Sequence, residues 1–142
     1  IYSPDNENFD RIIKIMELLN NPETVKEERQ KLGYEWDLMS YYSEEKLIEA
    51  RNRPNSGRTV GENLDYFRKL EVKNYDVRDE LGNIAIPVYI FAGRHDSQYP
   101  VEFGIEIKEY MPHSKLTIFE NSNHNPFIEQ EEDFKEFVKK TL

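Results

Sequence analysis

Apolar and polar positions follow two different patterns along the 142-residue chain, and the change falls near residue 85. Before that point, apolar residues recur every three or four positions between clusters of turn-forming residues, which is typical of amphipathic helices. After it, a continuous apolar run covers residues 86–92 and a second run covers residues 115–119. Runs rich in β-branched and aromatic residues are typical of strands buried on both faces of a parallel sheet. The pattern therefore predicts a helical first part and an alternation of strand and helix in the second.

The first predicted helix begins after a cap at residues 3–5 or at Asn8 and runs to about Asn20. Its apolar stripe follows the helical period at Phe9, Ile12, Ile13, Met16 and Leu19. We expect this stripe to be the buried face of the helix.

Two further helices are predicted before residue 55. Pro22 suits the first position of a helix over residues 23–32, which would end at Gly33. This helix is almost wholly polar, so we expect it on the surface. Ser43 suits the cap of a short helix that ends near Asn52.

The segment around these helices contains a turn cluster, a fourth helix and an aromatic patch. Residues 53–57 are the best candidate for a flexible joint. Helical spacing then continues at Val60, Leu64, Phe67 and Leu70. Between the second and third helices, aromatic residues crowd together, among them Trp36, Tyr41 and Tyr42. Aromatic side chains fill cores as well as pockets, so this patch is either core or the wall of a ligand site.

The stretch between the two predicted strands fits two periods. Residues 101–107 alternate apolar with polar or Gly positions, which on period alone favours a strand. Phe103, Ile107 and Tyr110 also share one helical face, with Pro100 at its start. Because a crossover between parallel strands needs a helix of about this length, we predict a helix. A last helix is predicted over residues 129–142, with acidic first turns and a basic end that suit its dipole.

Two chemically capable side chains follow the two predicted strands. Asp96 comes shortly after the first strand, and His124 comes after the second, 28 positions later. In open α/β sheets, functional residues collect in the crevice at the carboxyl ends of the strands. If the strands are parallel neighbours, Asp96 and His124 project from the same edge.

Composition excludes several classes of function. A net charge of −9 argues against a nucleic-acid partner, because phosphate binding needs a basic face. The chain has no Cys, so disulfides, thiolate metal sites and a cysteine nucleophile are excluded. His95 beside Asp96 suggests a metal pair, but the chain has three histidines and no matching carboxylate cluster, so we expect no metal and no cofactor. No apolar run approaches the roughly 18 residues of a membrane span, and no signal peptide is visible, so we expect no membrane partner and a cytoplasmic location.

The strand and loop motifs resemble those of the α/β-hydrolase family. Residues 86–100 look like the acid-bearing strand and loop of that family, and residues 111–124, followed by Glu129 and Phe134, look like its last strand, histidine loop and final helix. Residues 1–83 are similar in kind to the lid that precedes the acid strand, particularly in the proline-iminopeptidase-like branch. The resemblance implies an α/β fold in which a helical lid segment over residues 1–83 precedes the last two parallel strands and helices of the sheet, over residues 84–142.

The resemblance also implies roles for the two side chains. Asp96 and His124 match the acid and base of a Ser-His-Asp triad, in which the serine comes earlier in the chain. No Gly-x-Ser-x-Gly elbow occurs in the 142 residues, and Ser56 lacks the strand–turn–helix context of a nucleophile. We therefore interpret the chain as the carboxyl-terminal part of a serine hydrolase and expect it to be inactive alone. Asn123 stands where the family usually has Gly, which predicts a loop that is roomier or tolerates the left-handed (αL) conformation.

Substrate and partners follow less directly. The family includes peptidases and esterases, and the resemblance implies a peptide, aminoacyl or ester bond in a small molecule or short peptide. Glu44 or Glu45 could attract a substrate amine, and Trp36, Tyr41 and Tyr42 could line its site. The alternative is a catalytically silent binding or assembly module, and an upstream Gly-x-Ser-x-Gly would decide between the two.

Two strands cannot form a stable sheet alone, and in the family the remaining strands lie beside the acid strand. The helices before residue 80 could cover the sheet, but we favour a homodimer of the chain or association with the missing amino-terminal part, either of which would bury the edge of residues 88–92.

Overall fold

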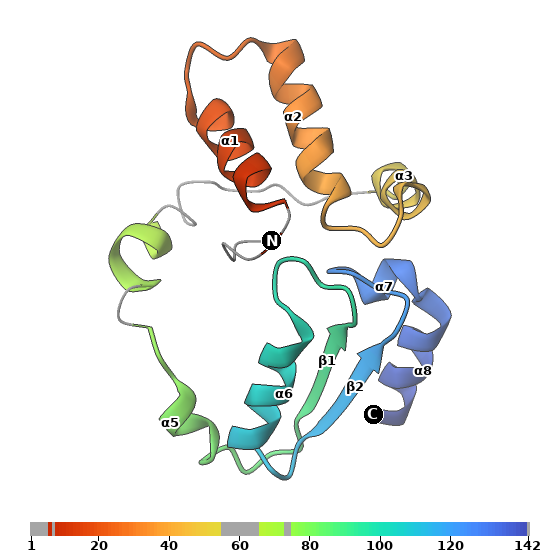
Figure 1. Ribbon diagram of the computed structural model, residues 1–142. Coiled ribbons are helices and arrows are strands. Elements are labelled where there is room, and N and C mark those ends of the chain that lie inside the picture. Colours follow the sequence, from red (N-terminus) through yellow and green to blue (C-terminus); the bar gives the residue numbers. More distant parts are fainter. Residues whose placement is uncertain (1–5, 7, 55–65, 73–74, 142) are drawn as a thin grey trace.

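The computed structural model describes residue 6 and residues 8–54, 66–72 and 75–141. Its second half is a strand–helix–strand unit, and three helices of the first half lie over one end of that unit (Figure 1). β1 (Tyr89–Gly93), α6 (Val101–Tyr110) and β2 (Lys115–Phe119) follow one another in the chain. The two strands pair in parallel, with Tyr89 opposite Lys115 and Gly93 opposite Phe119. Both predicted strands and the parallel sheet are confirmed.

The crossover between the strands is helical, as predicted. α6 packs against one face of the sheet, and Gly104 faces the strands from the buried side of the helix. A Cβ at this position would lie 3.4 Å from the Cβ of Ala92 and 3.5 Å from Cδ1 of Leu116. These are ordinary van der Waals distances, so α6 packs directly on the strands at this position.

The other face of the sheet is covered by α8 (Glu131–Thr141), which follows the short α7 (Pro126–Glu129). Four phenylalanines form this layer, with ring centroids 5.1 to 6.5 Å apart: Phe91, Phe119, Phe134 and Phe137. Aromatic pairs at such distances stabilise a core beyond their buried area. The cluster fixes α8 against the strands.

The prediction that the first strand is buried on both faces is wrong for the described chain. Phe91 is 42% exposed despite its contacts with α8, and Ile86, just before the strand, is 73% exposed. The sheet has two strands in the described part, so one edge of β1 carries no neighbour. Its apolar sequence is that of an inner strand, but its surroundings here are those of an edge.

The helical part begins with α1 (Phe9–Asn20), as predicted. Asn8 is at the cap position, although its side chain makes no capping hydrogen bond, and the alternative cap at residues 3–5 lies outside the described residues. Ile12 and Ile15 are completely buried, whereas Ile13 is 38% exposed. The buried face of α1 is therefore centred on Ile12 and Ile15, and is rotated about the helix axis from the predicted stripe.

The second helix departs from its predicted bounds, since α2 spans Lys26–Leu38. Pro22 lies within a turn instead of starting the helix, and that turn is closed by a hydrogen bond from the Thr24 N–H to the carbonyl of Asn21. The Thr24 hydroxyl donates to the carbonyl of Leu18 at 2.6 Å, and the Arg29 guanidinium donates to carbonyls of the same turn. The helix also continues through Gly33. Beyond this glycine, the Tyr34 hydroxyl donates a hydrogen bond to the carboxylate of Glu44 at the start of α3.

α3 (Glu44–Asn52) agrees with prediction, and the Ser43 hydroxyl accepts a hydrogen bond from the Lys46 N–H at 3.3 Å. The proposed joint lies largely outside the described residues, as do Val60 and Leu64 of the fourth predicted helix. The described remainder of that segment contains a π-helical turn, η1 (Phe67–Glu71), and a short helix not predicted, α5 (Arg78–Leu81). No helix in the described part of the chain is long and apolar enough to cross a membrane.

Candidate functional site

The end of β1 is held tightly against the loop that follows β2. A Cβ on Gly93 would lie 1.8 Å from the backbone oxygen of Asn123, so only glycine fits this approach. Beyond it, the Arg94 N–H donates to the carbonyl of Phe119 and the His95 N–H to that of Ser122, each at 2.9 Å. The two loops after the strands therefore form one bonded unit at the carboxyl edge of the sheet.

Within this unit, the structure brings Asp96 and His124 into contact. Nδ1 of His124 lies 3.0 Å from Oδ2 and 3.2 Å from Oδ1 of Asp96. The Asp96 side chain is 10% exposed and that of His124 is 34% exposed. The backbone N–H groups of Gln98 and Tyr99 donate to Oδ1 of Asp96 at 2.9 and 2.8 Å. The carboxylate is thus oriented by its own loop, and it orients the imidazole in turn.

The electrostatics of the pair agree with this geometry. Burial acts to raise the pKa of Asp96, but the hydrogen bond with His124 and the two backbone donors together hold that pKa below its ordinary value. The hydrogen bond with Asp96 raises the pKa of His124 above its ordinary value, against the opposing effect of burial. Each partner therefore stabilises the charged form of the other.

A hollow of about 340 Å³ adjoins the pair. Its wall is mostly apolar and includes Phe91, Pro126 and Phe127 in addition to Asp96 and His124. The ring of Tyr99, also in the wall, stacks on that of His124 with centroids 5.7 Å apart. In the described part of the chain, Nε2 of His124 has no hydrogen-bond partner, so it can receive a proton from a group placed in the hollow.

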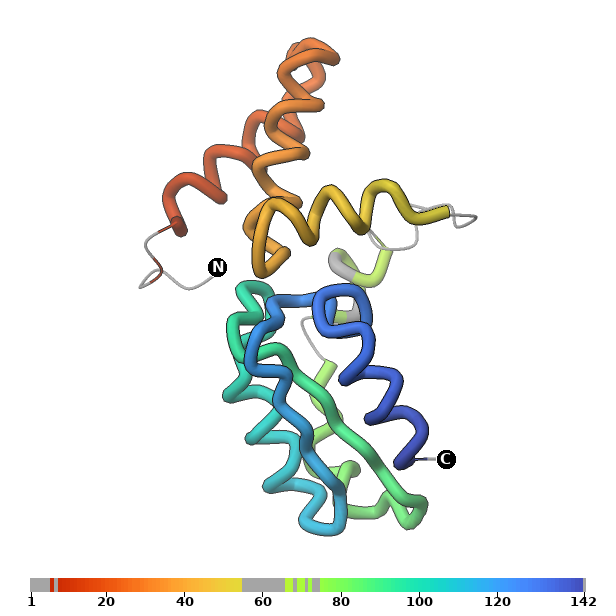
Figure 2. The backbone as a smooth tube through the Cα atoms, turned by 90° about the vertical axis from the view of Figure 1, so that its right-hand side faces the viewer, coloured from red at the N-terminus to blue at the C-terminus, as the bar shows by residue number. Residues whose placement is uncertain are grey.

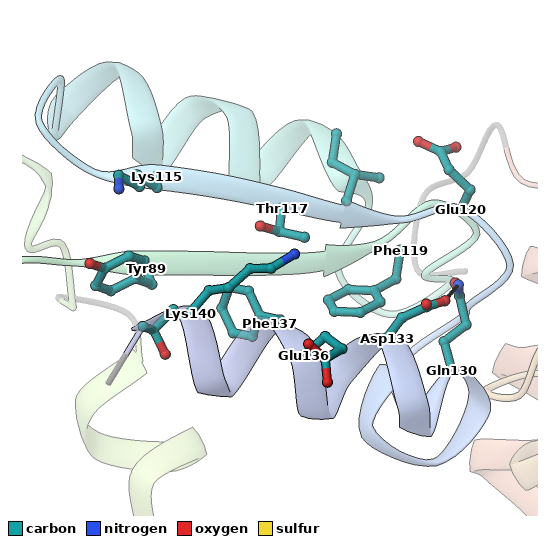
Figure 3. Close-up of a pocket in the computed structure, with 12 residues that line it drawn as sticks. Tyr89, Lys115, Thr117, Phe119, Glu120, Gln130, Asp133, Glu136, Phe137 and Lys140 are labelled. Carbon is teal, nitrogen blue, oxygen red and sulfur yellow. Dashed lines mark hydrogen bonds between the residues drawn. The ribbon is translucent and has the colours of Figure 1, made fainter.

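A larger hollow of about 490 Å³ lies elsewhere, between β2 and α8. Figure 3 shows Tyr89, Phe119 and Phe137 at its floor, with charged side chains such as Lys140 and Asp133 around them. It contains neither Asp96 nor His124. A third hollow, of about 530 Å³, is bounded by residues of α3, α7 and α8 and also contains neither residue, so we assign the site by its acid–base pair and not by volume.

The other predicted site residues do not join the pair. Glu44 and Glu45 lie exposed in the first turn of α3, and the Glu44 carboxylate accepts a hydrogen bond from the Tyr34 hydroxyl at 2.7 Å. Tyr42 is 47% exposed and its ring lies 5.3 Å from that of His95. Trp36, Tyr41, Tyr42, Glu44 and Glu45 are all absent from the wall of the hollow beside His124.

Tyr41 is partly buried, and burial raises the pKa of its phenol. Its backbone carbonyl reaches the histidine loop, where it accepts a hydrogen bond from the Asn123 side chain at 3.4 Å. The aromatic patch therefore contacts the histidine loop through its backbone, and the Tyr42 ring contacts His95 of the acid loop.

Sequence reasoning missed three residues that support the pair. Tyr99 stacks on the base, Asn123 links the two loops, and the carboxylate of Glu129 is 6% exposed beneath them. The sequence signal for Tyr99 was its position three residues after Asp96. An Asp can begin a turn by accepting a hydrogen bond from a backbone N–H that follows it, and such a turn brings the next residues close to the Asp side chain. The loop at Asn123, predicted to be roomier or to tolerate the left-handed conformation, does not adopt that conformation, since no described residue has a positive φ.

Among the described residues, no group of three or more His, Asp or Glu side chains is arranged so that it could hold a metal ion. His95 instead contacts the ring of Tyr42.

No family model matches the chain, but individual proteins do. A pimeloyl-[acyl-carrier protein] methyl ester esterase of Aliivibrio salmonicida is 32% identical over 59 residues, which cover 42% of this chain and 23% of that protein. A proline iminopeptidase of Saccharolobus solfataricus is 26% identical over 138 residues, which cover 97% of this chain and 38% of that protein.

Among solved structures, an alpha/beta fold family hydrolase from Bacillus anthracis superposes with a TM-score of 0.90 and 53% sequence identity, covering 100% of this chain and 51% of that one. This chain thus spans about half of that structure and less of the two curated relatives. The parallel strand–helix–strand unit and the similarity over the whole chain show the α/β-hydrolase fold, of which this chain matches a carboxyl-terminal portion.

Proposed function

We propose that this chain supplies the acid and the base of a serine hydrolase. The observation that carries the proposal is the contact between His124 Nδ1 and the Asp96 carboxylate at the carboxyl ends of adjacent parallel strands. With Nδ1 on the acid, the imidazole is held in the tautomer whose Nε2 accepts a proton. The hollow beside His124 is where a serine hydroxyl and an acyl group would meet it.

The chemistry divides between this chain and a nucleophile from outside these residues. The serine oxygen attacks the carbonyl carbon while its proton moves to Nε2 of His124, and the charge that develops on the imidazole is stabilised by Asp96. His124 then gives the proton to the leaving alcohol or amine. Water repeats the sequence on the acyl-enzyme, so His124 returns to its neutral form and the serine is released.

For the substrate, we propose an ester or amide with an apolar acyl group. The supporting observation is the apolar wall of the hollow, which includes Phe91, Pro126 and Phe127. The similar proteins include a pimeloyl-[acyl-carrier protein] methyl ester esterase and a proline iminopeptidase, whose names both indicate cleavage of an acyl bond. Glu44 and Glu45 lie outside this wall, so recognition of a substrate amine by them gains no support, and we favour the ester.

The isolated 142-residue chain should not hydrolyse p-nitrophenyl esters or aminoacyl p-nitroanilides above background. The physical reason is that its sequence contains no Gly-x-Ser-x-Gly nucleophile elbow around any of its seven serines. The measurement is initial rates for the chain alone and for the gene product that joins it to a Gly-x-Ser-x-Gly segment. Turnover by the chain alone that disappears in His124→Ala would contradict the division of the triad, whereas no turnover by either protein would favour a silent binding module.

The pH dependence should report the pairing of His124 with Asp96. His124 must be neutral to act as a base, so kcat/KM should rise with pH as the imidazole loses its proton. Because the hydrogen bond with Asp96 raises the pKa of His124, the midpoint of this rise should lie above the ordinary value of 6.5. In Asp96→Asn the residual activity should show a lower midpoint. An unchanged midpoint in that variant would show that Asp96 does not contact the base in the working enzyme.

A further inference from the structure

The carboxylate of Glu129, at the end of α7, holds the loop on both sides of His124. Its Oε2 accepts hydrogen bonds from the backbone N–H of Asn123 at 2.9 Å and of Asn125 at 3.0 Å. Its Oε1 accepts a third from the N–H of Tyr42, which lies 87 positions earlier in the chain. Burial raises the pKa of Glu129, although the three donors oppose this effect. One buried side chain therefore bonds the two neighbours of the base and a residue of the helical part.

The side chain of Asn123 makes a second connection between the same segments. Its Oδ1 accepts from the N–H of Ser97, in the loop of the acid, at 2.9 Å. Its Nδ2 donates to the carbonyls of Met39 at 3.0 Å and Tyr41 at 3.4 Å. Asn123 is 7% exposed, so these bonds are shielded from water.

The turn between α2 and α3, residues 39–42, is bound through its backbone. The carbonyl of Ser40 accepts from the N–H of His124 itself and from the side chain of Asn125, both at 3.3 Å. The hydroxyl of Ser97 and the side-chain amide of Gln98 add bonds to the same turn. Figure 2 shows this turn lying over the loops that follow β1 and β2. Three successive carbonyls and the next N–H of the turn are thus paired with the loops of the acid and the base.

We propose that Asn123 and Glu129 are positioning residues that lock the His124 loop to the turn at residues 39–42, so that the imidazole faces Asp96 only when the helical segment is docked. The consequence for catalysis rests on the proposed function, but the coupling itself is a property of the fold. It assigns the helical segment a role in the site although none of its residues lines the hollow beside His124, because its docking positions the imidazole.

The geometry explains why substitution of either residue should weaken the connection between the two segments. In Glu129→Gln, the amide keeps one acceptor oxygen, but its NH2 must face at least one of the N–H groups and leave it unpaired in a buried place. In Asn123→Gly, the loop keeps its backbone bond to Glu129 yet loses every bond to Ser97, Met39 and Tyr41. The two variants therefore cut the lock at different points.

Two matched controls separate the lock from general stability. Glu132→Gln changes an exposed carboxylate nearby in α8 that pairs with Lys135. Asn121→Gly makes the same change two positions before Asn123, on an exposed side chain. Both should leave every measured quantity within about twofold, since exposed polar pairs contribute little.

The test uses the full-length gene product that contains this chain and reads three quantities. In Asn123→Gly and Glu129→Gln, the Tyr42 amide hydrogen should exchange with solvent roughly tenfold or more faster. The reason is that the turn at residues 39–42 can then open locally without breaking all of the hydrogen bonds that hold it in the wild type. The NMR-measured pKa of His124 should fall toward its ordinary value as contact with Asp96 is lost. In turnover, kcat should fall roughly 10- to 100-fold while KM changes little, as expected for a misplaced base.

A purely structural role would lower the melting temperature of these variants without moving the His124 pKa or kcat, and that result would overturn the proposal. If the Tyr42 amide exchanged faster while the His124 pKa stayed unaltered, docking of the turn at residues 39–42 would not control the position of the imidazole, and the proposal would be overturned. If Asn123→Gly does not fold, Asn123→Asp serves instead, since it keeps the size and the Ser97 acceptor but turns the donor toward Met39 into an acceptor. If the wild-type protein shows no hydrolysis, the proposed function fails, while exchange and pKa still decide the coupling.

Discussion

His124→Ala should lower kcat by roughly 10⁴- to 10⁶-fold in a protein that joins this chain to its nucleophile segment, the range seen when the base of a serine triad is removed. Asp96→Asn should cost about 10⁴-fold, or about 5–6 kcal/mol of transition-state stabilisation. The two losses differ because His124 transfers the proton, while Asp96 orients the imidazole and stabilises its charged form. Steady-state kinetics on an activated ester would measure both.

His113→Ala is the matched control for the histidine, because His113 is exposed in the turn before β2 and lies outside the hollow beside His124. Its kcat should stay within about twofold of wild type, as for other exposed sites. The melting temperatures of all three variants should be compared, so that a loss of folding is not mistaken for a loss of chemistry. Near-normal kcat in His124→Ala with an intact fold would refute the triad assignment.

The second large effect concerns association. Large apolar side chains remain exposed beside the free edge of β1 and on α6, among them Ile86 at 73%, Phe103 at 50% and Phe91 at 42%. Burying each would contribute about 1.5–3 kcal/mol, which is large against the net stability of a small domain. We propose that a second chain covers this surface. The isolated chain should therefore scatter light as a dimer, with about twice its mass of 17.0 kDa.

The partner in the complete protein would be the segment that carries the nucleophile, since this chain covers 51% of the similar Bacillus anthracis hydrolase. Adding that segment should convert the dimer into a one-to-one complex. Ile86→Lys should weaken dimerisation at least tenfold by placing a charge in the apolar surface. Ile48→Lys, on a side chain of α3 that is 49% exposed, should not. A 17.0 kDa monomer with a cooperative melt would show that no second chain is needed.

The local pattern was sufficient to predict the strand–helix–strand unit and the meeting of Asp96 with His124. The β-branched and aromatic runs identified β1 and β2, and the parallel pairing that follows from a helical crossover brings the ends of both strands to one edge. Ser43 likewise identified the start of α3 through a short-range hydrogen bond. Such features depend on neighbours in the sequence, which is why they could be predicted.

The errors arose where contacts distant in sequence decide the structure. Gly33 does not end α2, because Tyr34 beyond it bonds Glu44 and lies under the guanidinium of Arg51 at 4.6 Å. Asn123 keeps a backbone with negative φ, and its side chain is held by two segments distant in the chain, the loop at Ser97 and the turn that contains Met39 and Tyr41. Neither arrangement leaves a periodic signal in the sequence.

Covalent labelling by a fluorophosphonate is the measurement that tests the central claim most directly, because the reagent reacts with a serine only when a base activates it. In the full-length gene product, we predict rapid modification of one serine in a Gly-x-Ser-x-Gly segment outside these 142 residues. In His124→Ala the rate of labelling should fall by orders of magnitude, and in His113→Ala it should not change. Undiminished labelling in His124→Ala, or labelling of one of the seven serines of this chain, would contradict the assignment of His124 as the base.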